Sequence, residues 1–426
     1  MKHNTRWLFL LLLVCVIPGV HAQSLKAGAA MRIITPDPLL PASGGIGTPR
    51  PTTDKRGELS VRALVFDSGD TAVALVAVDN LGWPAYWGDK TRKRVSAIPR
   101  ENIIIAATHT HSAPDAYCFP DLEGKHHADL NYLEWVCVQA ADAINEAWEK
   151  RQPARLKIAV GKAEGKIAYN YYAPQLYDPR CGVIQAVASA SDGAEKVIAT
   201  FVNYAIHPEV LGSDKGIISP DLCGPFYDRI ESKAGGIALF MNSAQGGMVT
   251  ADNRSERGDM EIWEECVRIG ELLADEALRI VADAEEQEQP VLHCSARIIS
   301  LPVENILMQL LMQSVPMADP LGEYDKVKTQ VNLLSVGTAQ LLTIPGEALP
   351  NIGFYLKRKM PARHPFLLGL ANDAFGYMLT KYDFNSFERY DYISETSLGE
   401  MAAEKYVEEA LDLIKSSPPP DRPLAK

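Results

Sequence analysis

Two stretches of alternating apolar and polar residues, each broken by a short polar turn, constrain the fold of this chain most. The first stretch joins residues 61–67 to 72–79, and the second joins 182–188 to 196–206. Alternation of this kind around a glycine-containing turn is typical of a β-hairpin. Because hairpin strands run antiparallel, we do not expect a Rossmann fold or a barrel built from repeated strand–helix units.

Further strands and helices are predicted from the spacing of apolar residues. Short apolar runs bounded by polar residues or glycine predict buried strands, at 103–107, 236–241, 333–344 and 366–370. Apolar residues at three-to-four spacing predict helices, at 130–151, 260–285 and 400–416. We find no sequence repeat, and we predict an α/β (mixed α+β) fold of mixed sheets with hairpins, flanked by helices.

The first 22 residues have the features of a signal peptide. Lys2 and Arg6 precede an apolar run over 7–17, and Ala22 ends a stretch with small residues where a signal peptidase cleaves. The run is shorter than the roughly 20 residues that span a bilayer. We therefore expect a secreted or periplasmic protein with a single catalytic domain over 23–415, followed by a disordered Pro-rich tail over 416–426.

The charge balance excludes one class of partner. The chain has 42 Lys and Arg residues against 54 Asp and Glu residues, giving a net charge of -12. Binding to a phosphate backbone depends on clustered cations, so we expect no nucleic-acid partner. No later segment is apolar enough to predict a transmembrane helix.

Without its signal the chain keeps six widely spaced cysteines and no CxxC pair, which disfavours a cysteine zinc site and leaves any disulfide pairing open.

Residues of metal-ligand type follow predicted strands at several places. His109 and His111 come directly after the 103–107 strand, and in an extended segment two such residues project to the same side. His207 ends the second hairpin in NYAIHP, Glu347 follows the 333–344 run in IPGE, and Tyr377 lies in a Gly-Tyr pair. Two imidazoles and a carboxylate form the ligand set of several catalytic zinc sites.

Taken together, these motifs resemble the neutral/alkaline non-lysosomal ceramidase family in its catalytic domain. The shared motifs are GAAMRIITPDPLLPASGG (28–45), THTHSAPD (108–115), NYAIHP (203–208), SPD (219–221), FMNSAQGG (240–247), IPGE (344–347) and the GLAN and GY pair (369–377). The resemblance implies a zinc ion on His109, His207, Glu347 and Tyr377. It also implies that His111 faces the substrate or the oxyanion.

The chain departs from the family pattern at positions that bear on the substrate. Thr250 stands where the family has a serine proposed as nucleophile, and Met248 replaces the preceding aspartate. Tyr171 and Tyr172 occupy a segment that carries an arginine in the family. Only 49 residues follow Tyr377, too few for the immunoglobulin-like domain of these ceramidases, so we expect the catalytic domain alone.

These observations predict an exported zinc-dependent hydrolase that cleaves a carboxamide (N-acyl) bond with activated water. Its catalytic residues are expected to be His111, Thr250 and Tyr377, and its substrate a small-molecule or lipid-like N-acyl compound, not necessarily ceramide. Two alternatives remain open at this point. One is an esterase or lactonase on the same fold, and the other is a non-catalytic exported binding protein with a structural zinc site.

Overall fold

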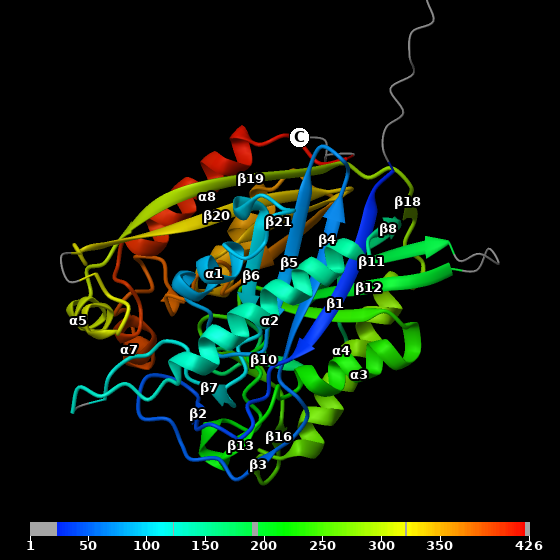
Figure 1. The fold of residues 1–426 in the computed structure, drawn as a ribbon. Helices are drawn as coiled ribbons and strands as arrows, with labels where there is room; N and C mark the ends of the chain where they lie inside the picture. The colour runs from blue at the N-terminus through cyan, green and yellow to red at the C-terminus, as the bar shows by residue number, and fades with distance from the viewer. Residues whose placement is uncertain (1–23, 122, 190–194, 320–321, 422–426) are drawn as a thin grey trace, which may run out of the picture.

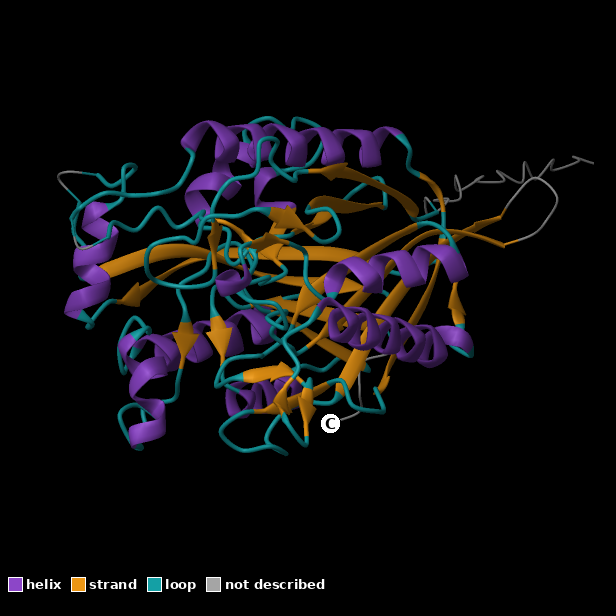
Figure 2. Cartoon of the chain, turned by 90° about the horizontal axis from the view of Figure 1, so that it is seen from below, coloured by secondary structure: helices purple, strands orange, loops and turns teal. Residues whose placement is uncertain are grey.

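The computed structural model describes residues 24–121, 123–189, 195–319 and 322–421. The predicted signal peptide lies outside the described residues. These residues form three large sheets with helices at the periphery and strands in the middle of the molecule (Figures 1 and 2). The prediction of a mixed α+β fold with hairpins flanked by helices is confirmed.

The first sheet has the order β6-β5-β4-β1-β8. Its elements are β1 (Lys26–Ile33), β4 (Ser60–Asp67), β5 (Ala72–Val78), α1 (Ala85–Arg92), β6 (Ile103–Ala107), α2 (Leu130–Glu149) and β8 (Gln152–Pro153). The hairpin predicted from alternation is β4 and β5, which pair antiparallel, whereas β6 returns through α1 to pair parallel with β5. Helix α2 then covers the outer face of the sheet.

The second sheet repeats this arrangement with the order β14-β12-β11-β9-β18. Its elements are β9 (Arg155–Lys162), β11 (Arg180–Ser189), β12 (Glu195–Tyr204), α3 (Cys223–Ala234), β14 (Ile237–Asn242), α4 (Trp263–Ala282) and β18 (Glu286–Gln287). The second predicted hairpin is β11 and β12, and β14 pairs parallel with β12.

The third sheet has the order β19-β20-β21-β23. Its elements are β19 (Leu292–Pro302), α5 (Ile306–Ser314), β20 (Lys326–Val336), β21 (Ala339–Thr343), α6 (Pro350–Lys359), β23 (His364–Leu368), α7 (Asp391–Glu395) and α8 (Ala402–Ser416). The single strand predicted over 333–344 is wrong, because Gly337 at a φ of 52° turns the chain into a hairpin of β20 and β21.

Each sheet therefore contains the same unit, an antiparallel meander followed by a helix and one parallel strand. Shorter strands complete the described fold: β2 (Ala42–Ser43), β3 (Asp54–Lys55), β7 (Ala113–Pro114), β10 (Ala168–Asn170), β13 (Ile217–Ile218), β15 (Val249–Ala251), β16 (Arg254–Ser255), β17 (Gly258–Asp259), β22 (Glu347–Ala348) and β24 (Tyr377–Met378). Because the last two strands of each unit are parallel, their carboxyl ends lie at the same edge of the sheet, where α/β folds bind ligands.

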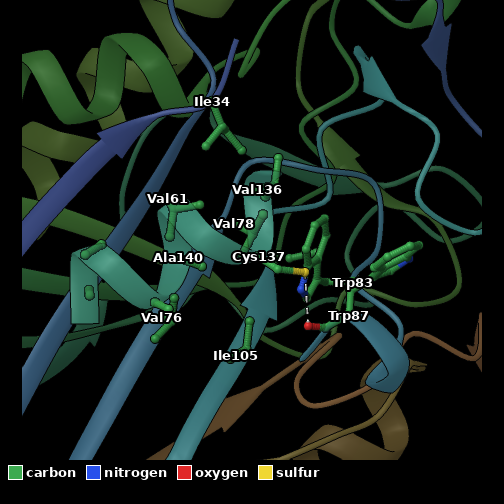
Figure 3. Packing of buried hydrophobic residues seen from close by; sticks show 14 of the residues in the cluster. Ile34, Val61, Val76, Val78, Trp83, Trp87, Ile105, Val136, Cys137 and Ala140 are labelled. Carbon is green, nitrogen blue, oxygen red and sulfur yellow. Dashed lines mark hydrogen bonds between the residues drawn. The ribbon is translucent and has the colours of Figure 1, made fainter. Parts of the chain in front are cut away.

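The three sheets face one another across a shared apolar core. Alternate residues of β4 show how this works, since Leu64 and Phe66 point into that core while Val61 and Val65 point outward against α2. Figure 3 shows the outer packing, in which Val136 and Ala140 of α2 lie over the first sheet.

The second and third sheets approach closely at Gly182. A side chain at this position would collide with the ring of Phe366, which itself packs 6.2 Å from Phe201. The glycine in the predicted strand is thus required by close packing between sheets.

The chain ends are only partly described. The tail expected to be disordered follows α8, and residues 417–421 are described as far as Asp421, whose backbone amide donates to the Gly337 carbonyl oxygen at 2.9 Å. The six described cysteines are free thiols, five of them buried. Among the described helices, none combines the length and apolar character needed to cross a bilayer.

Candidate metal centre

The predicted ligand residues meet at one edge of the three sheets. His109 and His111 follow β6, His207 follows β12, and Glu347 follows β21. Tyr377 is paired with Glu347 through the short parallel strands β24 and β22. Each of the three repeated units therefore contributes residues to the same place, at the carboxyl ends of its parallel strands.

The backbone at His109 differs from the extended segment expected for the His-Thr-His motif. His109 has a φ of 75°, in the left-handed region, and its amide donates to the Asn80 carbonyl oxygen at 2.9 Å. His111 is then held by its own amide, which donates to the carbonyl oxygen of Pro208 at 3.1 Å. The two imidazoles face one site because these loops fix them, and the extended geometry from which this was predicted is wrong.

Three imidazoles and one carboxylate converge within a few ångströms. Glu347 Oε2 lies 3.0 Å from His207 Nε2 and 3.4 Å from His109 Nε2. His111 Nε2 lies 3.4 Å from His109 Nε2. One ligand atom from each histidine lies within 4.8 Å of the others, which is the grouping needed to hold a metal ion.

Backbone oxygens fix the orientation of two of these rings. His109 Nδ1 lies 2.5 Å from the Leu81 carbonyl oxygen, and His207 Nδ1 lies 2.8 Å from that of Val249. A carbonyl oxygen can only accept a hydrogen bond, so both rings carry hydrogen on Nδ1 and turn Nε2 toward Glu347. A proton on His207 Nε2 satisfies the Glu347 carboxylate in the metal-free protein. A metal ion would take the place of that proton, and metal-bound histidines are oriented by a second contact of the kind that Nδ1 makes here.

The ionisable groups of the site shift one another's pKa values. Burial lowers the pKa of His207, but Glu209 and Glu347 raise it to about 9. Burial raises the pKa of Glu347, yet His109 and His207 hold it well below its usual range. Burial lowers the pKa of His111 to about 3, so its imidazole is neutral near pH 7.

Glu209 is part of this site and was missed in the sequence. Its Oε2 lies 3.7 Å from His111 Nδ1, and its carboxylate also accepts a hydrogen bond from Thr250. The available signal was a carboxylate two residues beyond His207, in His-Pro-Glu. A lone glutamate in a loop is usually solvated, so the sequence alone gave no reason to place it here.

Thr250 lies beside the histidines but does not line the cavity. It forms a bridge with the backbone of His207 and pairs with Tyr169 between β15 and β10. Its side chain contacts Glu209, and it is absent from the described residues that line the cavity. Ser243, which follows β14, is also absent from that lining, and its buried hydroxyl has no partner among the described residues.

Tyr377 lines the cavity with its ring and keeps its proton. Its hydroxyl donates to Met248 Sδ at 3.1 Å, at the position where the family pattern has aspartate. Burial and the charge of Glu347 raise its pKa well above the usual range for tyrosine. A neutral phenol in the wall of this cavity is suited to donating a hydrogen bond.

Three other residues singled out in the sequence lie further away. Asp221 accepts hydrogen bonds from the amides of Leu211 and Leu222, at 2.9 and 2.7 Å, so it steadies the loop after His207 without touching an imidazole. Tyr171 is exposed, and Tyr172 packs against Tyr390. Neither tyrosine is among the described residues that line the cavity.

A cavity of about 70 Å³ opens directly onto the histidines. Its wall combines the polar site with aromatic and aliphatic side chains, formed by Gly44, Gly45, Ile46, Leu81, His109, His111, Tyr117, Phe119, Met308, Glu347, Ala374, Phe375, Gly376, Tyr377, Tyr392 and Thr396. A second, mostly apolar cavity of about 160 Å³ adjoins it beneath α5, and the two share Tyr117, Phe119, Met308, Ala374 and Phe375.

Comparison with solved structures identifies the fold. The neutral ceramidase from Pseudomonas aeruginosa superposes with a TM-score of 0.73 at 16% identity, over 92% of this chain and 74% of that one. A ceramidase complexed with C2 gives a TM-score of 0.73 at 17% identity, over 92% of this chain and 75% of that one. The chain has a neutral-ceramidase-like fold.

This similarity lies in the fold and not in overall sequence. No family model and no curated protein matches the sequence. The resemblance that the short motifs carry is therefore supported by the fold, and the roles of individual residues are a separate question.

Proposed function

We propose that this chain is an exported, zinc-dependent hydrolase that cleaves the carboxamide bond of an N-acyl compound. The catalytic domain spans residues 23–415, and zinc is held by His109, His207 and Glu347, with Tyr377 as fourth ligand or close neighbour. The nucleophile is water. The bond to be cleaved belongs to a small-molecule or lipid-like substrate, whose amine and acyl parts the fold leaves undefined.

The orientation of the imidazoles is the observation that carries this proposal. His109 and His207 have their Nδ1 atoms bound to carbonyl oxygens, and their Nε2 atoms meet Glu347 Oε2 at 3.4 and 3.0 Å. Such a set turns two imidazole nitrogens and one carboxylate oxygen toward one point, and with His207 Nε2 deprotonated it fits a divalent cation of borderline softness. The neutral-ceramidase-like fold supports the same conclusion.

A bound zinc ion supplies Lewis-acid polarisation of the scissile carbonyl and activation of the attacking water. In the hydrolysis the oxygen of a water molecule bonds to the carbonyl carbon as one of its O–H bonds breaks, the C–N bond breaks, and the departing amine takes the released proton. His111 and Tyr377 both line the cavity, where each is placed to donate a hydrogen bond to the carbonyl oxygen as negative charge develops on it.

A covalent mechanism through Thr250 has less support than attack by water. The Thr250 side chain is engaged by Glu209, and the described lining of the cavity excludes it. A nucleophile must reach the reacting carbon at about 3 Å. Thr250 is instead assigned a weak polar contribution, through the contact that it makes with Glu209.

The main alternative is a non-catalytic protein in which zinc is structural. Structural sites are closed by four protein ligands, whereas catalytic sites keep an open position. Here His109, His111 and Glu347 are all exposed to one cavity. That opening favours a catalytic site over a closed one.

Metal analysis combined with a substrate panel tests the proposal. We expect about one zinc per chain after supplementation, and turnover of at least one N-acyl amide in a panel of amides, esters and lactones. His207→Ala should lose both, whereas the exposed His293→Ala should lose neither. A stoichiometry near zero, or loaded protein that cleaves none of the panel, contradicts the proposal. Export is tested by sequencing the mature N-terminus, expected at Gln23.

A further inference from the structure

Helix α5 exposes large aliphatic side chains to solvent without any accompanying charge. Ile306, Leu307 and Leu310 are 70%, 50% and 55% exposed, and Met308 is the buried residue of the helix. Residues 305–318 contain no charged side chain. A surface helix of a globular protein normally turns its polar face to water. The exposed apolar face of α5 therefore indicates a surface that binds something.

The helix lies next to the proposed active site. Its buried residue, Met308, lines both the cavity that holds His109 and Glu347 and the apolar cavity beneath α5. Figure 1 shows α5 at the edge of the molecule, close to α7 and near the ends of β19 and β20. The exposed face and the site are therefore separated by the thickness of a single helix.

More exposed apolar residues surround the same opening. Asn305 Nδ2 donates to the Glu395 and Ser397 carbonyl oxygens at 2.7 and 2.8 Å, which ties the start of α5 to the end of α7. Helix α7 carries Tyr392, an exposed residue in the wall of the first cavity, and exposed Ile46 lies in the same wall. Large exposed apolar patches of this kind mark sites of interaction.

We propose that α5 and the neighbouring rim dock on the surface of an electrically neutral lipid bilayer. The continuity of the apolar surface favours this occupant over a second copy of the chain. An acyl chain leaving the bilayer beside α5 would meet the apolar cavity of about 160 Å³, which shares the wall residues Met308 and Phe375 with the cavity at the histidines. A protein partner on this face would close that route.

The charge of the molecule specifies the type of bilayer. Interfacial helices that select anionic lipids carry Lys and Arg on their polar face, and α5 has none. The chain as a whole has a net charge of -12. Binding is therefore driven by burial of apolar side chains, with little dependence on salt and no preference for anionic lipid.

Sedimentation with phosphatidylcholine vesicles tests the proposal on the full mature chain. The triple variant Ile306→Glu, Leu307→Glu and Leu310→Glu should lower the partition constant by at least about 100-fold, because three charged side chains replace three that insert. Ile298→Glu is the matched control, since Ile298 is 64% exposed on β19 but lies away from the cavities. It should bind vesicles as the parent chain does, and the triple variant should keep its melting temperature.

The link to catalysis rests on the proposed function and is measured separately. The triple variant should retain turnover of a soluble short-chain amide but lose turnover of the same amide on a long chain in vesicles. His207→Ala should bind vesicles normally without turnover, so failure of the hydrolase proposal and failure of the docking proposal are distinguishable. The docking proposal is overturned by equal binding of the triple variant, by no binding of the parent chain, or by a parent dimer that the triple variant dissociates.

Discussion

The two ends of the cavity differ in the contacts of their side chains. The inner end is formed by the histidines and Glu347, and the outer end by the apolar residues of α5. At the inner end, His109, His207 and Glu347 are buried and each ring is held by a backbone oxygen, yet their free atoms point at one another. At the outer end, the side chains of Ile306 and Leu307 are 70% and 50% exposed to solvent. We propose a metal ion for the inner end and a bilayer surface for the outer end.

This contrast separates two kinds of specificity. Hydrogen bonds and metal coordination at the inner end depend on distance and direction, so removing one of these side chains should lower activity strongly. Apolar contacts at the outer end are non-directional and scale with buried area. Substitutions at the inner end should therefore remove chemistry, and substitutions further out should change affinity or pH dependence by smaller amounts.

Removal of His207 should have the largest effect. His207→Ala takes away an imidazole that contacts Glu347 at 3.0 Å and leaves that carboxylate with one fewer partner. We expect kcat/KM to fall by at least about 1,000-fold and zinc to be lost on dialysis. Elemental analysis and kinetics measure both. If the variant retained one zinc per chain, His207 would not be a ligand.

Removal of the Tyr377 hydroxyl should have the next largest effect. Tyr377→Phe keeps the ring in the cavity wall but deletes the donor that now contacts Met248 Sδ. Loss of one hydrogen bond to a developing oxyanion costs about 100-fold in kcat. The control is Tyr392→Phe, an exposed phenol in the same wall, which should stay near the parent value. Equal kcat in both variants would remove Tyr377 from the catalytic residues.

Glu209 is expected to affect the metal more than the chemical step. Glu209→Gln removes the charge that faces His111 Nδ1 at 3.7 Å and keeps the shape of the side chain. The charge of Glu209 also acts on the proposed ligand His207, whose pKa it raises, and carboxylates behind metal-binding histidines change metal affinity by about 10- to 100-fold. Competition with a chelator measures this, and exposed Glu256→Gln serves as the control. An unchanged zinc affinity would show that Glu209 acts only on the structure of the loop after β12.

Asp373, in the wall of the outer cavity, should make stability depend on pH. Burial raises its pKa from 3.8 to about 7, so the folded protein binds this proton more tightly than the unfolded chain does. Its stabilising contribution is full below about pH 4 and is lost as the pH rises through about 7. Asp373→Asn retains an oxygen that accepts from the Ala85 amide. The stability of this variant relative to the parent should therefore be greater at pH 8 than at pH 4.5. Thermal unfolding at the two pH values tests this, and the opposite order would show that the ionised carboxylate is needed.

The smallest effect is expected at Thr250. Thr250→Ser keeps the hydroxyl that contacts Glu209 and removes only a methyl group. Because the donor is retained, we expect kcat to change by less than about threefold. A rise of an order of magnitude, together with a burst of covalent intermediate, would instead indicate that a serine here can act as nucleophile.

Much of the fold was predictable because its signals are local. The hairpins β4–β5 and β11–β12 and the helices α2, α4 and α8 were predicted to within a few residues from alternation and apolar spacing. The run 333–344 was misread because its turn lies inside a continuous apolar stretch, where Gly337 is the one local signal. The three sheets share a topology that could not be predicted from a sequence repeat, because different side chains form the corresponding strands in each.

The candidate site was predictable to the extent that its residues lie in short motifs. His109, His111, His207, Glu347 and Tyr377 were singled out by residue type and position after strands, and the tertiary structure brings them to one edge. Glu209 was missed because its partners, His111 and Thr250, are distant in the sequence. The left-handed backbone of His109 was also missed, because it depends on a bond to Asn80.

The sequence by itself determined the strand-forming alternation, the residue types of the candidate metal site and the absence of charged residues along α5, since each is a property of neighbouring residues. Only the tertiary structure decided that three sheets present their strand ends to one cavity, that carbonyl oxygens turn two imidazoles toward Glu347, and that α5 leaves its aliphatic face uncovered beside that cavity. These depend on contacts between residues far apart in the chain, which no local pattern encodes.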